Sequence, residues 1–190
     1  MSRKYELKLR AERQAETRRR IVEATVALHT SVGPARTTIS AIADRAGVER
    51  HTVYAHFPDE RELFQACSAH WRSLHPFPDP SRWSAIHDPV RRFRAALNEV
   101  YGWYELVEED LAIFRRDADI HALTAELVAR REQALVPVRD VLADGWSRRT
   151  AMRAAIGLAL EFETWRSLAR RQGLSRKGAV DVMLRLVTSV

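Results

Sequence analysis

Apolar residues recur three or four positions apart along nearly the whole chain, and the apolar–polar alternation typical of strands is almost absent. This spacing predicts helices over residues 3–30, 39–45, 50–56, 60–74, 88–105, 109–116, 120–144, 148–171 and 176–188. Gly33 and Pro34 are stop signals for the first helix, and Pro137 should kink or break the helix over 120–144. We therefore expect an all-α protein.

A proline-rich stretch divides these helices into two groups. Residues 75–83 read HPFPDPSRW, with three prolines in five positions. Such a stretch is typical of a boundary between domains. We expect an N-terminal domain over residues 1–75 and a second helical domain over residues 76–190.

The composition is that of a folded domain. The 190 residues are 46% hydrophobic and 29% charged, which excludes a wholly disordered or fibrous chain. Cys67 is the only cysteine, which excludes an internal disulfide and a multi-cysteine zinc site. The chain has no apolar run near the roughly 20 residues of a membrane span, and its N-terminus lacks the apolar segment of a signal peptide. We expect a soluble, intracellular, cytoplasmic protein that does not contact a membrane.

Most of the net charge of +6 lies in an N-terminal arm, defined here as residues 1–20. The arm holds 8 basic and 3 acidic side chains, whereas the whole chain holds 31 Lys and Arg against 25 Asp and Glu. A basic excess alone raises the odds of a polyanionic partner only slightly. The charge alone therefore does not identify the partner, and the motif that follows the arm is more informative.

The segment over residues 38–57, TISAIADRAGVERHTVYAHF, has the pattern of two short helices joined by a tight turn. Thr38 can cap the first helix, and Gly47 suits the positive φ that a close crossing of two helices requires. Val53 and Phe57 return the second helix to a core. The side chains left on the exposed part of this second helix are Arg50, His51, Thr52, Tyr54, Ala55 and His56. Such a mixture of hydrogen-bonding, stacking and cationic groups suits the major groove of DNA.

The residues around this segment resemble the N-terminal helix-turn-helix domain of the TetR family, the tetracycline-repressor-like transcriptional regulators. The resemblance covers about residues 20–64 and rests on Ile21, Ala24, Leu28, Gly33, Thr38, Ile42-Ala43, Ala46-Gly47-Val48, Thr52-Val53-Tyr54, His56-Phe57 and Glu62-Leu63. It implies an N-terminal DNA-binding domain followed by a helical domain for ligand binding and dimerisation.

The resemblance also implies roles for individual residues. Base edges would be contacted by Arg50, His51 and Thr52. The DNA backbone would be held by Tyr54 and His56, and a phosphate would lie beside Thr38 and Ser40. Where the family often has a lysine near the start of the fourth helix, this chain has Arg61 as a possible substitute. The basic side chains of the arm can reach phosphates or a minor groove, or they can belong to a frayed, solvated helix: Arg3, Lys4, Lys8, Arg10, Arg13 and Arg18 to Arg20.

Other chemistries find little support. Taken alone, Tyr54 and Phe57 could be core aromatics of a small helical domain. The seven histidines include no pair four residues apart, so we expect neither a metal site nor a cofactor. Glu105, Glu108, Glu109 and Asp110 form an acidic run that suits helix capping better than acid–base catalysis. Because catalytic motifs and phosphate-binding glycine loops are also missing, we expect no catalytic residues and no enzyme.

Aromatic residues gather in the second domain, where they form a core or line a cavity for a small hydrophobic or aromatic effector. The candidates are Trp103, Tyr104, Phe114, His121, Trp146, Phe162 and Trp165, with Glu161, Glu163 or Arg115 as further polar groups. Two apolar stripes over residues 148–171 and 176–188 either close the monomer's own core or pack as a homodimer. The stripes are Met152, Ala155, Ile156, Ala159, Leu160 and Glu163, and Val180, Met183, Leu184, Leu186, Val187 and Val190.

These observations predict a homodimeric, sequence-specific regulator that binds double-stranded operator DNA. We expect a repressor that a small molecule releases from a palindromic operator. One alternative is a regulator without small-molecule control, either an activator or a protein-contact module. A more distant alternative is a small all-helical enzyme with a fortuitous helix-turn-helix pattern.

Overall fold

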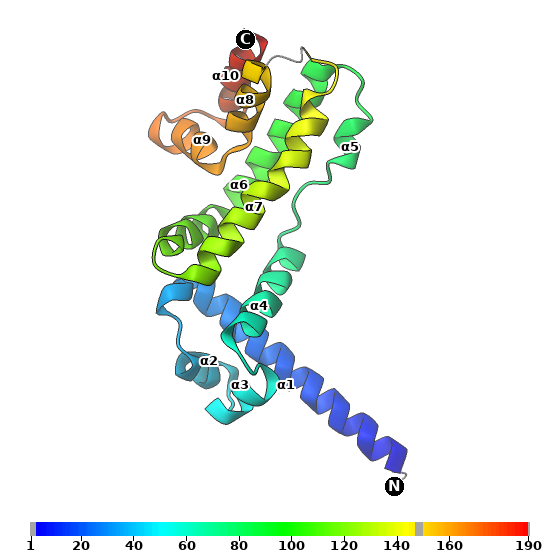
Figure 1. Cartoon of the computed structure of the whole chain (residues 1–190), viewed down its shortest axis with the longest axis vertical. Helices are drawn as coiled ribbons and strands as arrows, with labels where there is room; N and C mark the ends of the chain where they lie inside the picture. The colour runs from blue at the N-terminus through cyan, green and yellow to red at the C-terminus, as the bar shows by residue number, and fades with distance from the viewer. Residues whose placement is uncertain (1–2, 147–149, 190) are drawn as a thin grey trace. The chain divides into compact units, whose positions relative to one another are not determined.

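The computed structural model describes residues 3–146 and 150–189, and the described residues form helices and no strand, as the sequence predicts. In chain order the helices are α1 (Arg3–Ser31), the 3-10 turn η1 (Pro34–Arg36), α2 (Ile39–Ala46), α3 (Arg50–His56), α4 (Glu60–Leu74), α5 (Ser81–Ser84), α6 (Pro89–Ala118), α7 (Ala122–Ala143), α8 (Thr150–Leu160), α9 (Phe162–Arg166), the π-helical turn η2 (Ser167–Arg171) and α10 (Arg176–Thr188) (Figure 1).

The chain forms two compact units. The first contains residues 1–76 together with residues 109–128, and the second contains residues 77–108 and 129–190. The first division falls at Pro76, inside the proline-rich stretch, and the others fall within α6 and α7. The first unit thus holds a segment that lies far from the helix-turn-helix in the sequence. The functional roles expected of the two parts stay predictions.

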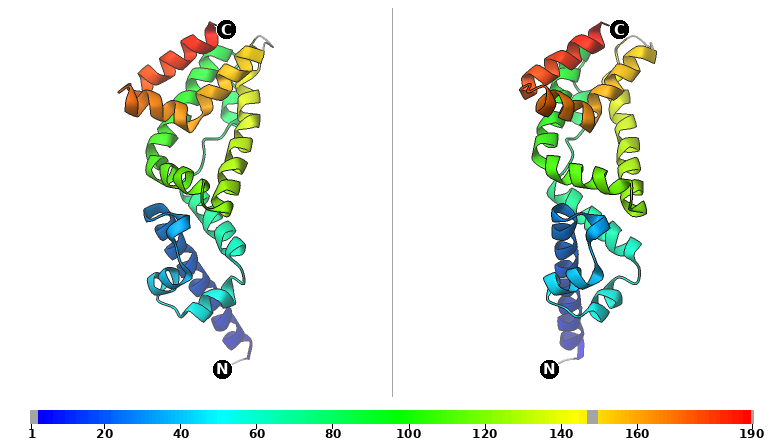
Figure 2. Two further views of the ribbon diagram at one scale, coloured as in Figure 1. Left: turned by 60° about the vertical axis from the view of Figure 1, so that its left-hand side comes forward. Right: turned by 90° about the vertical axis from the view of Figure 1, so that its left-hand side faces the viewer.

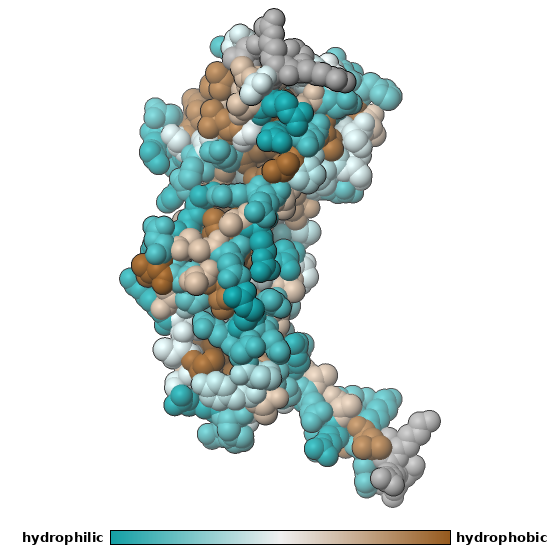
Figure 3. All heavy atoms as spheres, viewed as in Figure 1, coloured by the Kyte–Doolittle hydropathy of each residue, from teal (hydrophilic) through white to brown (hydrophobic). Residues whose placement is uncertain are grey.

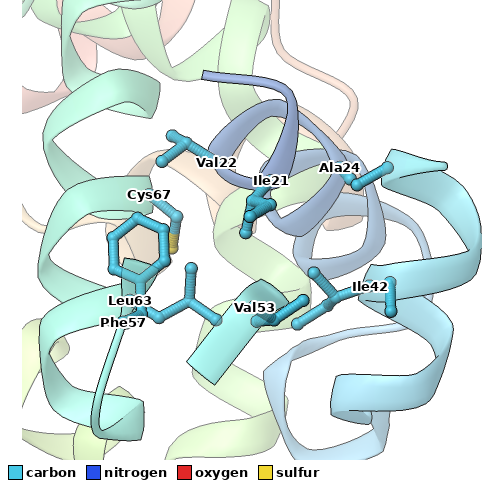
Figure 4. Packing of buried hydrophobic residues seen from close by; sticks show 10 residues of the cluster. Ile21, Val22, Ala24, Ile42, Val53, Phe57, Leu63 and Cys67 are labelled. Carbon is cyan, nitrogen blue, oxygen red and sulfur yellow. The ribbon is translucent and has the colours of Figure 1, made fainter. Parts of the chain in front are cut away.

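The core of the first unit joins α1, α2, α3 and α4. Figure 4 shows apolar side chains from these helices and the turn after α3 pointing toward one another: Ile21, Val22, Ala24, Ile42, Val53, Phe57, Leu63 and Cys67. These side chains recur at helical spacing, so one stripe of each helix is buried. In Figures 1 and 2 the N-terminal turns of α1 extend beyond α2, α3 and α4.

In the second unit α10 packs beside α8, both labelled in Figure 1. The two stripes that the sequence offered to a dimer are mostly buried in the unit's own core; Ile156, Ala159, Val180 and Val187 are each at most 1% exposed. Most of both stripes therefore closes the monomer's own core, and packing of these helices as a homodimer stays a prediction. Val190 lies outside the described residues.

One predicted helix break is confirmed, and one predicted helix end is wrong. Residues 88–105 and 109–116 lie on either side of a kink in α6 at Val107, whose φ of −115° and ψ of 16° are not helical, so the break expected between residues 105 and 109 is present. The helix expected over 148–171 ends at Leu160, because Glu161 is extended and α9 begins after it. The hydroxyls of buried Tyr101 and Tyr104 donate to the carbonyl oxygens of Ala159 and Leu160, which satisfies the end of α8. The expected start at residue 148 lies outside the described residues.

Pro137 does not break its helix, since α7 runs through it from Ala122 to Ala143. Proline lacks the N–H that would bond the carbonyl oxygen of Gln133, one turn earlier. Pro137 and Gln133 are both exposed. Water can therefore take the place of the missing donor, and the helix continues.

Candidate nucleic-acid interface

Local signals shape the turn between α2 and α3 as the sequence predicts. The Thr38 hydroxyl accepts a hydrogen bond from the backbone N–H of Ala41 at 3.1 Å and so caps α2. Gly47 ends α2 with φ 63° and ψ 44°, in the left-handed region that favours glycine. A Cβ at Gly47 would meet Nη2 of Arg20 at 2.7 Å. The turn is thus specified both by backbone conformation and by close packing.

Helix α3 divides its side chains between a core and an open surface. Val53 is fully buried, and Phe57, just after the helix, is 2% exposed. Tyr54 is 48% exposed. The other outward residues divide into exposed Arg50, His51 and Ala55 and half-buried Thr52 and His56. Thr52 and His51 lie within hydrogen-bonding reach of each other, with 3.4 Å between Oγ1 and Nε2.

The start of α2 lies next to this surface in sequence. Thr38 is exposed and Ser40 is half-buried. The Thr38 oxygen is already an acceptor for Ala41, so its hydroxyl hydrogen is what it can offer an anion. Backbone N–H groups in the first turn of a helix favour an anion as well. This end of α2 is therefore chemically suited to a phosphate.

Three arginines of the N-terminal arm make contacts within the protein, which the sequence did not predict. Two of them contact the helix-turn-helix segment, and the third forms ion pairs within α1. Nη2 of Arg20 donates to the carbonyl oxygens of Ala46 and Gly47, at the turn itself. The Arg18 guanidinium lies over the Phe57 ring, 4.4 Å from its centroid. Arg19 pairs with Glu16 and Glu23 on α1, so each of these three guanidinium groups has a partner within the protein.

The rest of the arm is an exposed helix rather than an unfolded tail. Residues 5–16 are exposed, and Lys8 pairs with Glu12 at 3.8 Å. Arg10 and Arg13 are exposed on this stretch. Figure 3 shows the arm as mostly hydrophilic with isolated apolar side chains. The side chains of Arg3 and Lys4 lie outside the described residues.

Arg61, the expected phosphate contact of α4, is held by a carboxylate from the other part of the first unit. Its two terminal nitrogens donate to the oxygens of Glu126 at 2.6 and 2.9 Å. This pair raises the pKa of Arg61 above its ordinary value. Glu126 lies 65 residues further along the chain, so no sequence signal marks the pair. Arg61 has to leave Glu126, or share it, before it can hold a phosphate.

The structure brings together four of the seven residues expected to line an effector pocket. Ring centroids of Trp103, Tyr104, Phe162 and Trp165 lie 5.4–5.6 Å apart along the cluster. These distances are those of packed aromatic pairs. Trp165 is fully buried, and its indole N–H has no acceptor among the described atoms.

The other three candidates lie elsewhere. Phe114 and His121 belong to the first unit, where they contact Trp71 and Phe64 at ring distances of 5.8 Å. Trp146 is half-buried in the second unit, and its indole N–H also lacks an acceptor among the residues described. Of the further polar groups, Glu161 is exposed and Glu163 lies 3.9 Å from Arg166. Arg115 belongs to the first unit.

The described residues contain neither a membrane-spanning helix nor a cluster of metal ligands. No helix within residues 3–146 and 150–189 is long and apolar enough to cross a membrane. Over the same ranges, no three histidine, cysteine or acidic side chains gather as a metal site would require.

Comparison of the sequence with known proteins points to one family. Residues 21–67 match the family model described as bacterial regulatory proteins, tetR family. The transcriptional regulator TtgR of Pseudomonas putida is 46% identical over 55 residues, 29% of this chain and 26% of that protein. The probable acrEF/envCD operon repressor of Escherichia coli is 30% identical over 83 residues, 43% of this chain and 38% of that protein. The match thus spans 26–38% of the length of these relatives.

Solved structures share the fold over most of the chain. A TetR-like transcriptional regulator from Rhodococcus sp. RHA1 superposes with a TM-score of 0.60 at 18% identity, over 90% of this chain and 93% of that one. AibR, in complex with isovaleryl coenzyme A and operator DNA, superposes with a TM-score of 0.57 at 21% identity, over 88% and 96%. At such identities the likeness shows the fold alone. Residues 21–67 are therefore similar in sequence to the tetR family of bacterial regulatory proteins, and most of the chain shares the fold of a TetR-like regulator.

Proposed function

We propose that this chain regulates transcription by binding operator DNA through residues 38–57, and that it acts as a repressor. One observation carries the proposal. Val53 of helix α3 and Phe57 just after it are buried in the core, while Arg50, His51 and Tyr54 of the same helix are exposed. A helix held this firmly by its inner face can enter a major groove without losing its packing.

The proposed contacts follow the exposure of each side chain. Arg50, His51 and Thr52, in the first turn of α3, read base edges, because the N-terminal end of a recognition helix meets the bases. Tyr54 and His56 hold the DNA backbone, and phosphate contacts at the start of α2 come from Thr38 and Ser40. The guanidinium of Arg50 can bind the two acceptors of a guanine edge.

We propose that the functional unit is a homodimer. Helix α3 has seven residues and spans about 10 Å, so a single head reads few base pairs. Two heads about 34–36 Å apart read successive major grooves of a palindrome. Helices α8 and α10 also carry exposed apolar side chains, Leu158, Val182 and the stripe residue Leu186, at 44%, 42% and 37%. These three would pack against a second copy.

We propose further that a small hydrophobic or aromatic effector controls the repressor through the second unit. The support is the buried indole N–H of Trp165, which lies among aromatic rings and lacks an acceptor among the described atoms. A buried donor without a partner costs free energy that an acceptor on a ligand would recover. AibR, which shares the fold, was solved with both isovaleryl coenzyme A and operator DNA. To release DNA, an effector must bind the released conformation more tightly than the DNA-bound one.

Fluorescence anisotropy with duplexes from the region upstream of the chain's own gene tests the proposal. We expect saturable binding that requires both halves of a palindrome. Arg50→Ala should cost about 1–3 kcal/mol and relax the preference at one base position. Arg45→Ala removes an exposed arginine of α2 instead and should leave the base preference unchanged.

Each alternative predicts a different result. Indifference to all duplexes would refute the regulator and leave the enzyme as the alternative. Specific binding that no small molecule weakens would leave a regulator without small-molecule control. Because the proposed target is chromosomal DNA, the proposal also places the protein in the cytoplasm.

A further inference from the structure

The first unit contains a cavity of its own, between α1, α2, α3 and the start of α4. Its volume is about 320 Å³. This lies at the lower end of the range of small-molecule sites, about 300–1,000 Å³. Its apolar walls are formed by Pro34, Ile39, Ile42, Phe57, Leu63 and Phe64. A ligand of the size of one substituted aromatic ring would fit such a space.

His29 lines this cavity with an unused acceptor. The side chain is 9% exposed. Its Nδ1 lies 3.4 Å from Sγ of Cys67, and that thiol lies 3.2 Å from the carbonyl oxygen of Phe64, to which it donates. Because the thiol hydrogen is used there, we assign the ring hydrogen to Nδ1, which then donates to the sulfur. Nε2 is then a bare acceptor, and no described residue donates to it.

The charge state of His29 agrees with this assignment. Burial, and then the nearby His121, lower the pKa of His29 to about 4, although Asp117 acts in the opposite direction. The imidazole is therefore neutral at pH 7. A ligand that reaches Nε2 has to bring its own hydrogen-bond donor.

The charged groups that line the cavity are both carboxylates, Asp59 and Glu60. The carboxylate of Asp59 accepts a hydrogen bond from the backbone N–H of Glu62 at 2.8 Å. The carboxylate of Glu60 accepts one from Nε2 of His121 at 3.0 Å. Each carboxylate has further lone pairs. Neither a lysine nor an arginine is among the lining residues, so the cavity has a negative rim without a compensating cation in its wall.

The threonines of the wall also favour a ligand that carries hydrogen-bond donors. The hydroxyl of Thr25 donates to the carbonyl oxygen of Ile21, and that of Thr37 donates to the carbonyl oxygen of Gly33, both at 2.8 Å. Their oxygens can therefore only accept from a ligand. Apolar walls surrounded by hydrogen-bond acceptors and negative charges favour a ligand that has an apolar body, a positive charge and N–H donors.

We propose that this cavity binds a small aromatic cation, with its ring against the apolar walls and its N–H groups donating to Nε2 of His29 and to the carboxylates of Asp59 and Glu60. Tyr54 also lines the cavity, on the helix proposed to meet DNA. An occupant would contact the recognition helix itself and weaken DNA binding from within the head. That consequence rests on the proposed function, whereas binding to the cavity does not.

Calorimetric titration of the full chain with benzamidine, a cation at pH 7, tests binding without DNA. Benzoate and benzyl alcohol have a similar shape but carry a negative charge and no charge, respectively. We expect benzamidine to bind with one site per chain, benzyl alcohol at least tenfold more weakly, and benzoate not at all. Amide chemical shifts in NMR should change within residues 25–64.

Charge-removing variants locate the site. Asp59→Asn keeps an oxygen to cap α4, and the double variant with Glu60→Gln should weaken benzamidine binding roughly tenfold, as expected when a charged hydrogen bond becomes a neutral one. Asp44→Asn, an exposed carboxyl outside the lining, should bind as the wild type does. Equal binding of benzoate, or an unchanged affinity in the double variant, would overturn the inference. Loss of DNA recognition with benzamidine binding intact would overturn only the proposed function.

Discussion

The buried His29 should make the stability of the fold depend on pH. An unfolded chain binds a proton on this imidazole below pH 6.5, whereas burial and the nearby His121 lower the pKa of His29 to about 4 in the folded chain. Between these values the unfolded state holds more protons, so the free energy of unfolding falls as the pH drops from 6.5 to 4. The difference between the two pKa values corresponds to about 3 kcal/mol, at about 1.4 kcal/mol per pKa unit.

Urea denaturation followed by circular dichroism at pH 7, 6, 5 and 4 measures this effect. Carboxylates also titrate near pH 4, so the useful quantity is the difference between the wild type and His29→Gln. Over this range that difference should shift by about 3 kcal/mol in favour of the variant, which has no imidazole to protonate. His51→Gln, on the exposed face of α3, should keep the wild-type profile. Parallel profiles for the wild type and His29→Gln would refute the reasoning.

The remaining predictions concern the helix-turn-helix and the Arg61 pair. Thr38→Ala removes the cap of α2 and should lower the free energy of unfolding by about 1 kcal/mol in urea, whereas Thr38→Ser should restore most of it. Gly47→Ala forces alanine into the left-handed region and displaces Arg20, so it should cost more than the roughly 1–2 kcal/mol of backbone strain alone. Gly173→Ala, at φ 68° with open space around it, measures that strain by itself; equal losses would refute the role of Arg20. Glu126→Gln removes the ion pair of Arg61, which can then contact a phosphate. The slope of log K for DNA binding against log salt concentration should become steeper by about 0.9 per DNA-binding head. The control Glu109→Gln removes an exposed charge of the same unit that has no pair with Arg61, and an equal change there would show that Arg61 gains no phosphate contact.

Much of the fold could be predicted from the sequence because its signals are local. The cap at Thr38, the left-handed Gly47 and the stop after Ser31 each depend on residues within a few positions of one another. The apolar spacing likewise predicted that Val53 and Phe57 are buried. The resemblance to the tetR family rested on the same stretch, since the family model matches residues 21–67.

Tertiary structure decided what depends on groups far apart in the chain. Arg20 reaches carbonyl oxygens 26 and 27 residues away, and Arg61 meets a carboxylate 65 residues away. Buried Arg92 donates to the carbonyl oxygen of Asp144 at 2.6 Å, and the hydroxyl of Tyr104 satisfies the end of α8.

The division between the two kinds of information has a physical cause. Helix capping, turn conformation and amphipathic spacing are short-range effects, so adjacent residues specify them wherever the segment lies in space. The partner of a guanidinium or of a buried hydroxyl is whichever group packing brings within about 3 Å, and many side chains of a sequence could serve. The sequence alone therefore predicted helix α3 and its exposed residues, while only the folded chain decided which arginines are held within the protein and that His29 lines a cavity.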